Sequence, residues 1–279
     1  MIDAHQHLIE PDRFGYPWLS GVPELHGDFN LERYRAEAST AGIGASIFVE
    51  VDVTEQDQTA EAQFFCALAE DPNSKILGVV AGCRPEASDF DEQLARIQHD
   101  KVLGLRRILH VVPDSISQSD TFRRNVASLA DLDLSFDLCV RAEQLPLALE
   151  LIAAAPQTQF VLDHCANPPA SDSEDWQAWC DDIARCADFA NVACKFSGLG
   201  THCDSGLQPI LEQVSTSFGW DRLLFGGDWP VCLLAETSLS CWTGSVRALL
   251  SNQSEERQAA FFSGNATRIY GCLDPQITS

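Results

Sequence analysis

Residues 1–7 read MIDAHQH, a short β-rich run that ends in two histidines separated by one residue. Seven further β-rich runs follow at residues 44–51, 75–82, 102–109, 134–140, 158–164, 191–198 and 222–230. Segments with helical patterns separate these runs along the chain. Strands that alternate with helices are typical of a parallel sheet, and eight of them in 279 residues predict a closed (β/α)8 TIM barrel.

The connecting segments carry helix signals of their own. Asn30 stands where an N-cap would begin a helix over residues 30–41. Further helical patterns cover residues 57–70, 119–131, 142–155 and 174–190. The loop ANPPASDSED, residues 166–175, follows a strand, so we interpret it as part of the active side and not as a domain boundary. Because neither a linker nor an internal repeat interrupts the alternation, the sequence predicts a single domain over residues 1–279.

The composition excludes several classes of partner. Acidic residues number 41 against 18 basic ones, a formal net charge of −23, so nucleic acid and anionic membranes would be repelled. No apolar run is long enough to span a bilayer, and the first residues lack the pattern of a signal peptide. The 11 cysteines include no Cys-x-x-Cys pair, which favours reduced thiols over a disulfide framework or a zinc finger. We therefore expect a cytoplasmic protein with a small-molecule substrate. The sequence does not decide whether it forms a homo-oligomer.

The barrel prediction places the chemistry at the carboxyl ends of the strands, where the active sites of this fold lie. Side chains alternate along a strand, so His5 and His7 share one face of the first strand. We expect that face to point inward together with Asp3, while Ala4 and Gln6 face the helices. Two inward imidazoles in this spacing can hold one ion or one substrate oxygen from the same side.

Polar residues also end the later strands. Asp163 and His164 end the sixth strand, Lys195 and Ser197 the seventh, and Asp228 the eighth. These side chains would converge on one barrel mouth, with His164 and Asp228 opposite the histidine pair. The alternative is that the histidines simply form hydrogen bonds in a polar core.

The remaining histidines are interpreted as structural: His26, His99, His110 and His202. His110 and His202 follow the fourth and seventh strands, so either is also placed to line the pocket. Glu50 and Asp52 end the second strand, and the sequence leaves open whether they reach the pocket.

Six motifs occur in the order and spacing of a known family. They are DAHQH (3–7), GLRRIL (104–109), VRAEQLP (140–146), FVLDHCANPP (160–169), NVACKFSGL (191–199) and LLFGGDWPVCLL (223–234). The chain resembles, essentially end to end, the lactonase branch of the amidohydrolase superfamily. It is most similar to sugar-lactone hydrolases such as L-fuconolactonase and L-rhamnonolactonase; pyrone-dicarboxylate lactonase and sulfomuconolactone hydrolase look like more distant relatives. The resemblance implies a TIM barrel that adds water to a cyclic ester, with Asp228 as general base.

The sequence differs from the wider superfamily in the residues that would hold metal ions. Binuclear members bridge two metals with a carbamylated lysine or a glutamate and carry a further histidine on a later strand. Lys75 and Lys101 fall at or before the starts of their strands, and Lys195 lies on the seventh. Either no metal is required, which the resemblance favours, or one divalent ion, zinc first, is held by His5, His7, His164 and Asp228.

Basic residues near the strand ends are candidates to bind the substrate in place of a second metal. They are Arg141, Lys195 and one of Arg106 and Arg107, since alternation lets only one of these two face inward. Each could instead form a surface ion pair. Trp229, directly after Asp228, either walls the pocket or packs in the core.

We predict a hydrolase that opens a sugar-acid lactone, such as an aldono-1,4- or 1,5-lactone, by attack of a water that Asp228 activates. His5 and His7 would orient this water or polarise the carbonyl, and His164 with one basic residue would complete the oxyanion contacts. One alternative is a mononuclear metal-dependent hydrolase or decarboxylase of the same superfamily. Another is a sugar-acid-binding protein on a decayed scaffold, although such a protein would have lost its base. Ring size and sugar configuration are not encoded in these patterns.

Overall fold

The computed structural model describes residues 1–201, 206–235 and 237–272, and its strands form one parallel sheet in the order β1 to β8. The strands are β1 (Ile2–Gln6), β2 (Ala45–Val49), β3 (Ile76–Gly82), β4 (Val102–Ile108), β5 (Ser135–Cys139), β6 (Phe160–Leu162), β7 (Val192–Phe196) and β8 (Leu223–Phe225). A parallel bridge between Gln6 and Trp229 joins the end of β1 to the segment after β8 and closes the barrel. The predicted (β/α)8 barrel is therefore confirmed, and each of the eight expected runs contains a strand.

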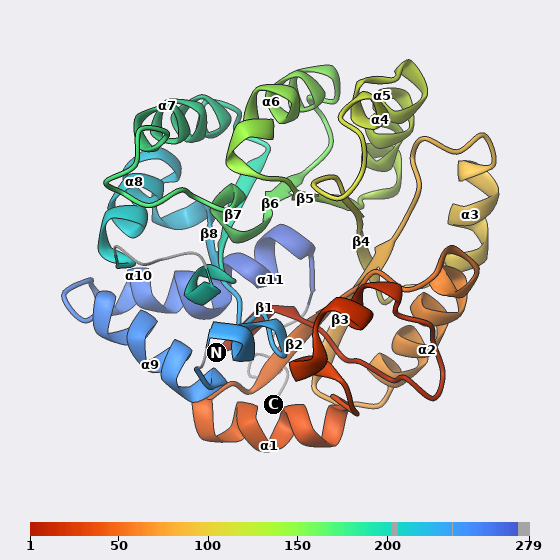
Figure 1. The fold of residues 1–279 in the computed structure, drawn as a ribbon, viewed down its shortest axis with the longest axis horizontal. Helices are drawn as coiled ribbons and strands as arrows, with labels where there is room; N and C mark the ends of the chain where they lie inside the picture. Colours follow the sequence, from red (N-terminus) through yellow and green to blue (C-terminus); the bar gives the residue numbers. More distant parts are fainter. Residues whose placement is uncertain (202–205, 236, 273–279) are drawn as a thin grey trace.

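Helices surround this barrel (Figure 1). They are α1 (Leu31–Ala41), α2 (Gln58–Glu70), α3 (Phe90–Ile97), α4 (Ser115–Gln118), α5 (Asp120–Ala127), α6 (Leu145–Ala154), α7 (Trp176–Ala187), α8 (Gln208–Phe218), α9 (Leu239–Leu249), α10 (Glu255–Ala259) and α11 (Asn265–Tyr270). Asn30 caps α1 as expected, because its Oδ1 accepts a hydrogen bond from the Arg33 amide at 3.1 Å. At the other end of α1, Gly42 adopts the left-handed conformation that terminates many helices (φ 73°).

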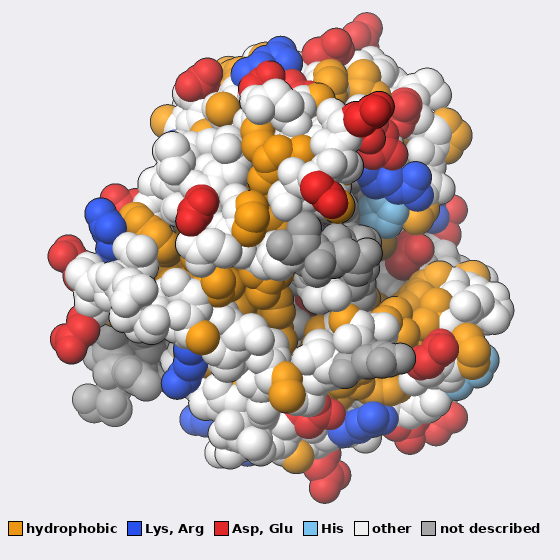
Figure 2. Space-filling view, turned by 60° about the vertical axis from the view of Figure 1, so that its left-hand side comes forward, with side chains coloured by type: hydrophobic (Ala, Val, Ile, Leu, Met, Phe, Trp, Pro, Cys, Tyr) orange, Lys and Arg blue, Asp and Glu red, His pale blue; other side chains and the backbone are white. Residues whose placement is uncertain are grey.

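The surface reflects the acidic composition. On the face drawn in Figure 2, aspartate and glutamate side chains are spread over several elements and are not gathered into one patch. Within the described residues, no helix combines the length and the hydropathy that crossing a membrane requires.

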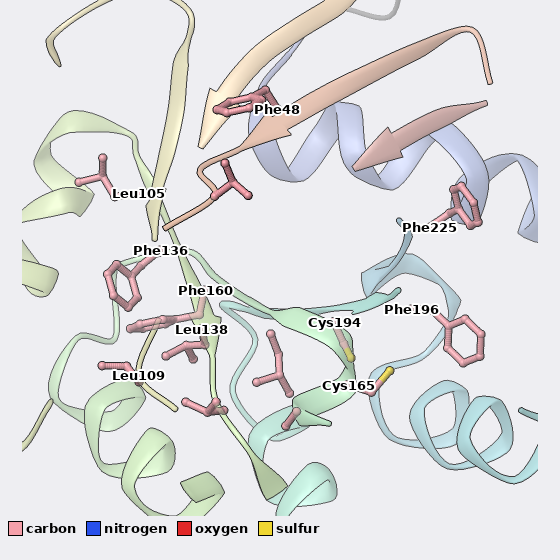
Figure 3. Close-up of a cluster of buried hydrophobic side chains, with 14 of the residues drawn as sticks. Phe48, Leu105, Leu109, Phe136, Leu138, Phe160, Cys165, Cys194, Phe196 and Phe225 are labelled. Carbon is pink, nitrogen blue, oxygen red and sulfur yellow. The ribbon is translucent and has the colours of Figure 1, made fainter. Parts of the chain in front are cut away.

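The outer faces of the strands build the main core against the helices. Phe136 of β5 packs edge-on against Phe160 of β6 and Phe122 of α5, with ring centroids 6.2 and 6.0 Å apart. Figure 3 shows Phe136 and Phe160 beside Leu138, with Phe196 and Phe225 further along the same layer. Each such side chain contributes about 1.5–3 kcal/mol when it is fully buried. This packing also decides which alternate residues of each strand point into the barrel.

A second, smaller apolar cluster fills the lower part of the barrel interior. It comes from alternate residues of several strands and from α11, including Ile2, Ala4, Ile47, Val80, Val161, Ala193, Leu224 and Tyr270. Because this cluster is apolar, the polar inward residues lie above it, toward the carboxyl ends of the strands. The cluster thus forms the base on which the polar site is built.

A bulge in β1 changes which of its residues point inward. The register between β1 and β2 shifts so that Asp3 to Gln6 spans one residue more than Ser46 to Phe48. The expectation that Asp3 faces inward is wrong: its carboxylate accepts hydrogen bonds from the Tyr34 hydroxyl of α1 at 2.9 Å and from the Gly227 amide at 2.6 Å. Ala4, expected to face the helices, instead joins the interior cluster. The extra residue restores His5 to the inward face.

Candidate active site

A cavity of about 560 Å³ opens at the carboxyl ends of the strands. Its lining residues come from the ends of strands and from the segments that follow them: His7, Trp18, Val51, Asp52, Arg106, Ile108, His110, Val111, Cys139, Arg141, Glu143, His164, Asn167, Gly198, Asp228 and Val231. This is the barrel end that carries active sites in TIM-barrel enzymes. A larger hollow of about 950 Å³ lies at the opposite end against α1, where Lys75 is one of its lining residues.

Three imidazoles converge on one carboxylate at the base of the cavity. The Nε2 atoms of His5, His7 and His164 lie 3.7, 3.4 and 4.0 Å from Oδ1 of Asp228. Burial by itself would raise the pKa of Asp228, but the facing His164, His7 and His5 outweigh it and lower this pKa to about 2. We call this group, His5, His7 and His164 around Asp228, the histidine cage. Its carboxylate is ionised at neutral pH and is therefore able to accept a proton.

Each imidazole is oriented by its second nitrogen. His7 Nδ1 donates to the Val49 carbonyl oxygen at 2.8 Å, so the Nε2 of a neutral His7 presents a lone pair to the cavity. His164 Nδ1 forms a hydrogen bond with the Ser197 hydroxyl at 2.9 Å. Nδ1 of the fully buried His5 lies 3.2 Å from Asp163 Oδ1. Burial and the neighbouring Lys195 lower the pKa of His5 despite the opposing effect of Asp163, so His5 is neutral.

Glycines allow the backbone around Asp228 to approach the cage. A Cβ on Gly226 would lie 2.7 Å from Cβ of His5, and a Cβ on Gly198 would lie 2.5 Å from Nδ1 of His164. Asp228 itself has a left-handed backbone (φ 53°), and its amide donates to the His5 carbonyl at 2.8 Å. The glycines of KFSGL and FGGDWP are therefore needed for close packing at the site.

Beneath the cage lies a buried set of charges from five strands or strand ends. It comprises Glu50, Arg106, Asp137, Asp163 and Lys195, and we call it the ion layer. Lys195 Nζ lies 2.5 Å from Asp137 Oδ2 and 3.1 Å from Asp163 Oδ1. Arg106 Nε donates to Glu50 Oε1 at 2.6 Å, and Arg106 Nη1 lies 3.4 Å from Asp163 Oδ2.

The pKa shifts in the ion layer follow its pairing. Burial would lower the pKa of Lys195, but Asp137 and Asp163 outweigh it and raise this pKa, which keeps the ammonium charged. Burial would raise the pKa of Asp163, yet Lys195, His5 and Arg106 hold it well below its usual range. Burial raises the pKa of Asp137 to about 6 despite Lys195 and the Tyr270 hydroxyl, which donates to it at 2.8 Å. The layer is therefore a network of paired groups.

The structure rules out one candidate for binding the substrate and decides between the two alternatives given for another. Lys195 was expected to contact substrate, but its side chain is fully buried in the ion layer because two carboxylates hold it there. Trp229 was offered as a pocket wall or a core residue, and the second applies: its ring is fully buried and packs against Phe29 and Tyr34, with centroids 5.5 and 5.4 Å apart. Asp228 turns toward the cavity, so the next side chain turns away from it.

The neighbouring Arg106 and Arg107 point to opposite faces of β4, as the alternation of side chains along a strand requires. Arg106 points inward and lines the cavity, whereas Arg107 points outward and donates to Glu86 Oε1 at 2.8 Å. Of these two candidates for binding the substrate, only Arg106 lies at the cavity, and Arg107 does not. Arg141 lines the cavity rim with a side chain that is 56% exposed, 3.8 Å from Glu143.

The structure also shows which of the residues that the sequence left undecided reach the cavity. Asp52 lines the cavity, whereas Glu50 lies below it, bound to Arg106. His110 lines the cavity too, although it was interpreted as structural, and its Nδ1 is 3.5 Å from Sγ of Cys139. Burial, with Arg141 and Arg106 nearby, lowers the pKa of His110 to about 4.

The other histidines lie away from the cavity or outside the described residues. His26 forms a hydrogen bond with the Leu19 carbonyl, and His99 lies 3.3 Å from Glu70. His202 falls outside the described residues.

Some site residues gave a weak signal in the sequence or none. Asp137 lies in the β-rich run 134–140, and its alternation with Phe136 and Leu138 indicates an inward carboxylate. Trp18 lies in a short 3-10 helix, Pro17–Gly21, and Asn167 lies in the loop after β6, and neither segment has a periodic pattern. The contact between Tyr270 and Asp137 joins residues 133 positions apart, so no local pattern reveals it.

The cage fits one metal ion. His5, His164 and Asp228 each offer a ligand atom, and these atoms lie within 4.8 Å of one another. Two imidazole nitrogens and a carboxylate oxygen are ligands that zinc accepts. His7 Nε2, 3.4 Å from the same carboxylate oxygen, adds a further potential ligand. An ion bound there would lower the pKa of a bound water.

Lys75 lies directly before β3 and Lys101 directly before β4, at the starts of their strands as the sequence indicated. Lys195 is held by carboxylates. None of the three lysines is therefore available to bridge two metals at the cage.

Comparisons with known proteins agree with this architecture. A family model described as amidohydrolase matches residues 2–272. An L-fucono-1,5-lactonase from Burkholderia multivorans is 31% identical over 291 residues, covering 98% of this chain and 97% of the relative. An L-fucono-1,5-lactonase from Burkholderia ambifaria is 27% identical over 280 residues, covering 96% and 94%.

A solved structure of an amidohydrolase from Burkholderia multivorans with bound zinc superimposes with a TM-score of 0.87 at 30% identity, covering 98% of this chain and 99% of that one. The same fold occurs in a probable 2-pyrone-4,6-dicarboxylic acid hydrolase from Acinetobacter baumannii, with a TM-score of 0.75 at 13% identity. On the strength of the match over residues 2–272, this chain belongs to the amidohydrolase family.

Proposed function

We propose that this protein hydrolyses the lactone of a sugar acid. The observation that carries the proposal is the Asp228 carboxylate, which three imidazoles keep ionised at the base of an open cavity. Hydrolysis of an ester needs an activated water, a place for negative charge on the carbonyl oxygen and a proton for the leaving alkoxide. The residues of the cavity can supply all three.

Asp228 accepts a proton from a water molecule as the water oxygen attacks the lactone carbonyl carbon. His7, whose Nε2 faces the same carboxylate at 3.4 Å, forms a hydrogen bond with this water and so orients it. Arg106, with His164, stabilises the negative charge on the former carbonyl oxygen. The bond between the carbonyl carbon and the ring oxygen then breaks, and Asp228 returns its proton to that oxygen. The product is an open-chain hydroxy acid, which ionises and releases one proton.

The charges of the cavity favour a neutral substrate. Of the basic side chains that line it, Arg106 is paired with Glu50 and Asp163, and Arg141 faces Glu143. Carboxylates of Asp52, Glu143 and Asp228 also line the cavity. An additional carboxylate on the substrate would meet these charges without an unpaired cation, so a polyhydroxylated neutral lactone fits better than a dicarboxylate.

The relatives suggest which lactone to test first. Two of them carry the name L-fucono-1,5-lactonase, which denotes a six-membered ring with hydroxyl groups and a methyl group. Beside its polar groups the cavity has an apolar part that includes Trp18, Val51 and Val231, suited to a methyl group or a ring face. We propose L-fucono-1,5-lactone as the first substrate, with other 1,5- and 1,4-aldonolactones next.

The test is a lactone panel assayed by proton release at neutral pH in weak buffer. We expect turnover of hydroxylated aldonolactones well above the spontaneous rate. Asp228→Asn serves as the matched control, because it removes the base and keeps the side-chain shape. Activity confined to a phosphotriester or a cyclic amide would contradict the proposal.

We further propose that a metal ion is not essential and that the protein works in the cytoplasm. The proposed steps are carried out by Asp228, the histidines and Arg106, side chains that the cavity itself supplies. In the described part of the chain, no disulfide joins one cysteine to another and nine cysteines are buried, which suits a reducing compartment.

A further inference from the structure

Asp52 is an acidic residue that lines the cavity and takes no part in the proposed hydrolysis steps. It follows β2 and has a left-handed backbone (φ 51°), a conformation that is uncommon outside glycine. Its amide donates to Glu50 Oε2 at 2.8 Å, and the preceding Val51 carbonyl accepts from Trp18 Nε1 at 2.9 Å. The loop thus holds Asp52 in a defined place on the cavity wall.

The Asp52 carboxylate differs from the other acids of the cavity in having no partner among the described residues. Asp228 faces three imidazoles, and Glu143 lies 3.8 Å from Arg141. The carboxylate oxygens of Asp52 form neither a hydrogen bond nor an ion pair with any residue in the described ranges. Its side chain is half-buried, and burial together with the nearby Glu50 raises the pKa of Asp52. Hydrogen-bond donors from a ligand would relieve this cost.

We propose that Asp52 determines substrate specificity by accepting hydrogen bonds from hydroxyl groups on neighbouring carbons of the lactone ring. This inference rests on the proposed lactonase function and adds the part of the substrate that is recognised. A carboxylate accepts two such hydrogen bonds at once, and hydrogen bonds to charged groups are stronger than those between neutral ones. A site built in this way discriminates against an analogue that lacks the hydroxyls. Asp52 is a specificity residue that leaves the bond-breaking steps to Asp228.

The variant Asp52→Asn separates this role from a purely structural one. Asparagine adopts the left-handed backbone as readily as aspartate, so the loop keeps its conformation. The amide, however, has one acceptor oxygen and no charge. Asp133→Asn is the matched control, because Asp133 also has a left-handed backbone (φ 54°) but lies exposed before β5, at the opposite end of the barrel.

The experiment compares two lactones with the same ring. One is the best hydroxylated 1,5-lactone of the panel, and the other is δ-valerolactone, which has no hydroxyl groups. For Asp52→Asn we expect kcat/KM on the hydroxylated lactone to fall about 10- to 100-fold, mainly through KM, the effect of losing hydrogen bonds to a charged group. On δ-valerolactone kcat/KM stays within about twofold, since no such bond is lost. Asp133→Asn changes neither value.

Two outcomes overturn the inference. One is an equal loss on both lactones, which would mean a general disturbance of the site; the other is no loss on either. If the wild-type protein hydrolyses no lactone at all, the proposed function fails, and calorimetric binding then tests Asp52 separately. A six-carbon aldonate should bind more weakly to Asp52→Asn than to wild type, whereas 5-hydroxypentanoate should bind both alike. Equal aldonate affinity in the two proteins would overturn the inference.

Discussion

The ion layer and the histidine cage lie one above the other in the same barrel, yet their side chains have different partners. In the ion layer, Lys195 and Arg106 are each in contact with two carboxylates, and Lys195 is fully buried. In the cage, Asp228 faces nitrogen atoms at 3.4 to 4.0 Å, a separation that leaves room for a hydrogen-bonded water or an ion. The paired charges of the ion layer stabilise the barrel, whereas the Asp228 carboxylate of the cage is available for chemistry.

The largest effect should follow from changing the centre of the cage. In Asp228→Asn we expect turnover to fall by about 10² to 10⁴, the usual contribution of positioned acid–base catalysis, with the fold and much of the substrate affinity retained. The measurement is kcat and KM on the best lactone together with thermal unfolding. A folded variant that hydrolyses the lactone at nearly the wild-type rate would remove Asp228 from the mechanism.

The ion layer should instead respond through stability. Lys195→Met leaves the buried Asp137 and Asp163 without their shared cation, so we expect the free energy of unfolding to fall by about 3–5 kcal/mol. Urea unfolding measures this change. The control is Arg185→Met, whose exposed ion pair with Asp182 is expected to contribute less than about 1 kcal/mol. If both variants lose the same stability, the ion layer does not support the barrel as described.

The walls of the cage should matter less than its centre. His164→Asn or His5→Asn removes one orienting or electrostatic contact and leaves the base in place, so we expect about a 10-fold loss in kcat. Steady-state kinetics beside Asp228→Asn gives the order of the effects. A histidine variant that loses more activity than Asp228→Asn would shift the role of base to the imidazole.

Metal removal should have the smallest effect. Because Asp228, His7 and Arg106 supply the proposed steps, we expect dialysis against a chelator to lower the rate on the best lactone by less than about twofold. Metal analysis of the dialysed protein shows whether the cage has been emptied. A rate that the chelator abolishes and zinc restores would favour the metal-dependent alternative.

Much of the cage was predictable because it depends on local periodicity. The alternation of side chains put His5 and His7 on one face, and each strand end could be located from its β-rich run. The same alternation allowed only one of Arg106 and Arg107 to face inward. The partners of these residues could not be predicted in the same way. The sequence placed Lys195 near the end of a strand, but the carboxylates that bind it come from β5 and the end of β6.

The sequence by itself determined the order of strands and helices, the barrel mouth as the place of the chemistry and the candidate residues there, since these follow from short-range patterns of apolar and polar residues. Only the tertiary structure decided that β1 contains a bulge, that Asp3 turns outward to Tyr34 and that Lys195 is buried beneath the site. It also showed that Asp52 lines the cavity and that its carboxylate has no partner within the part of the chain that the structure describes. These outcomes depend on pairing between distant segments, where the energy of burying a charge is decided by which carboxylate or hydroxyl the fold brings beside it.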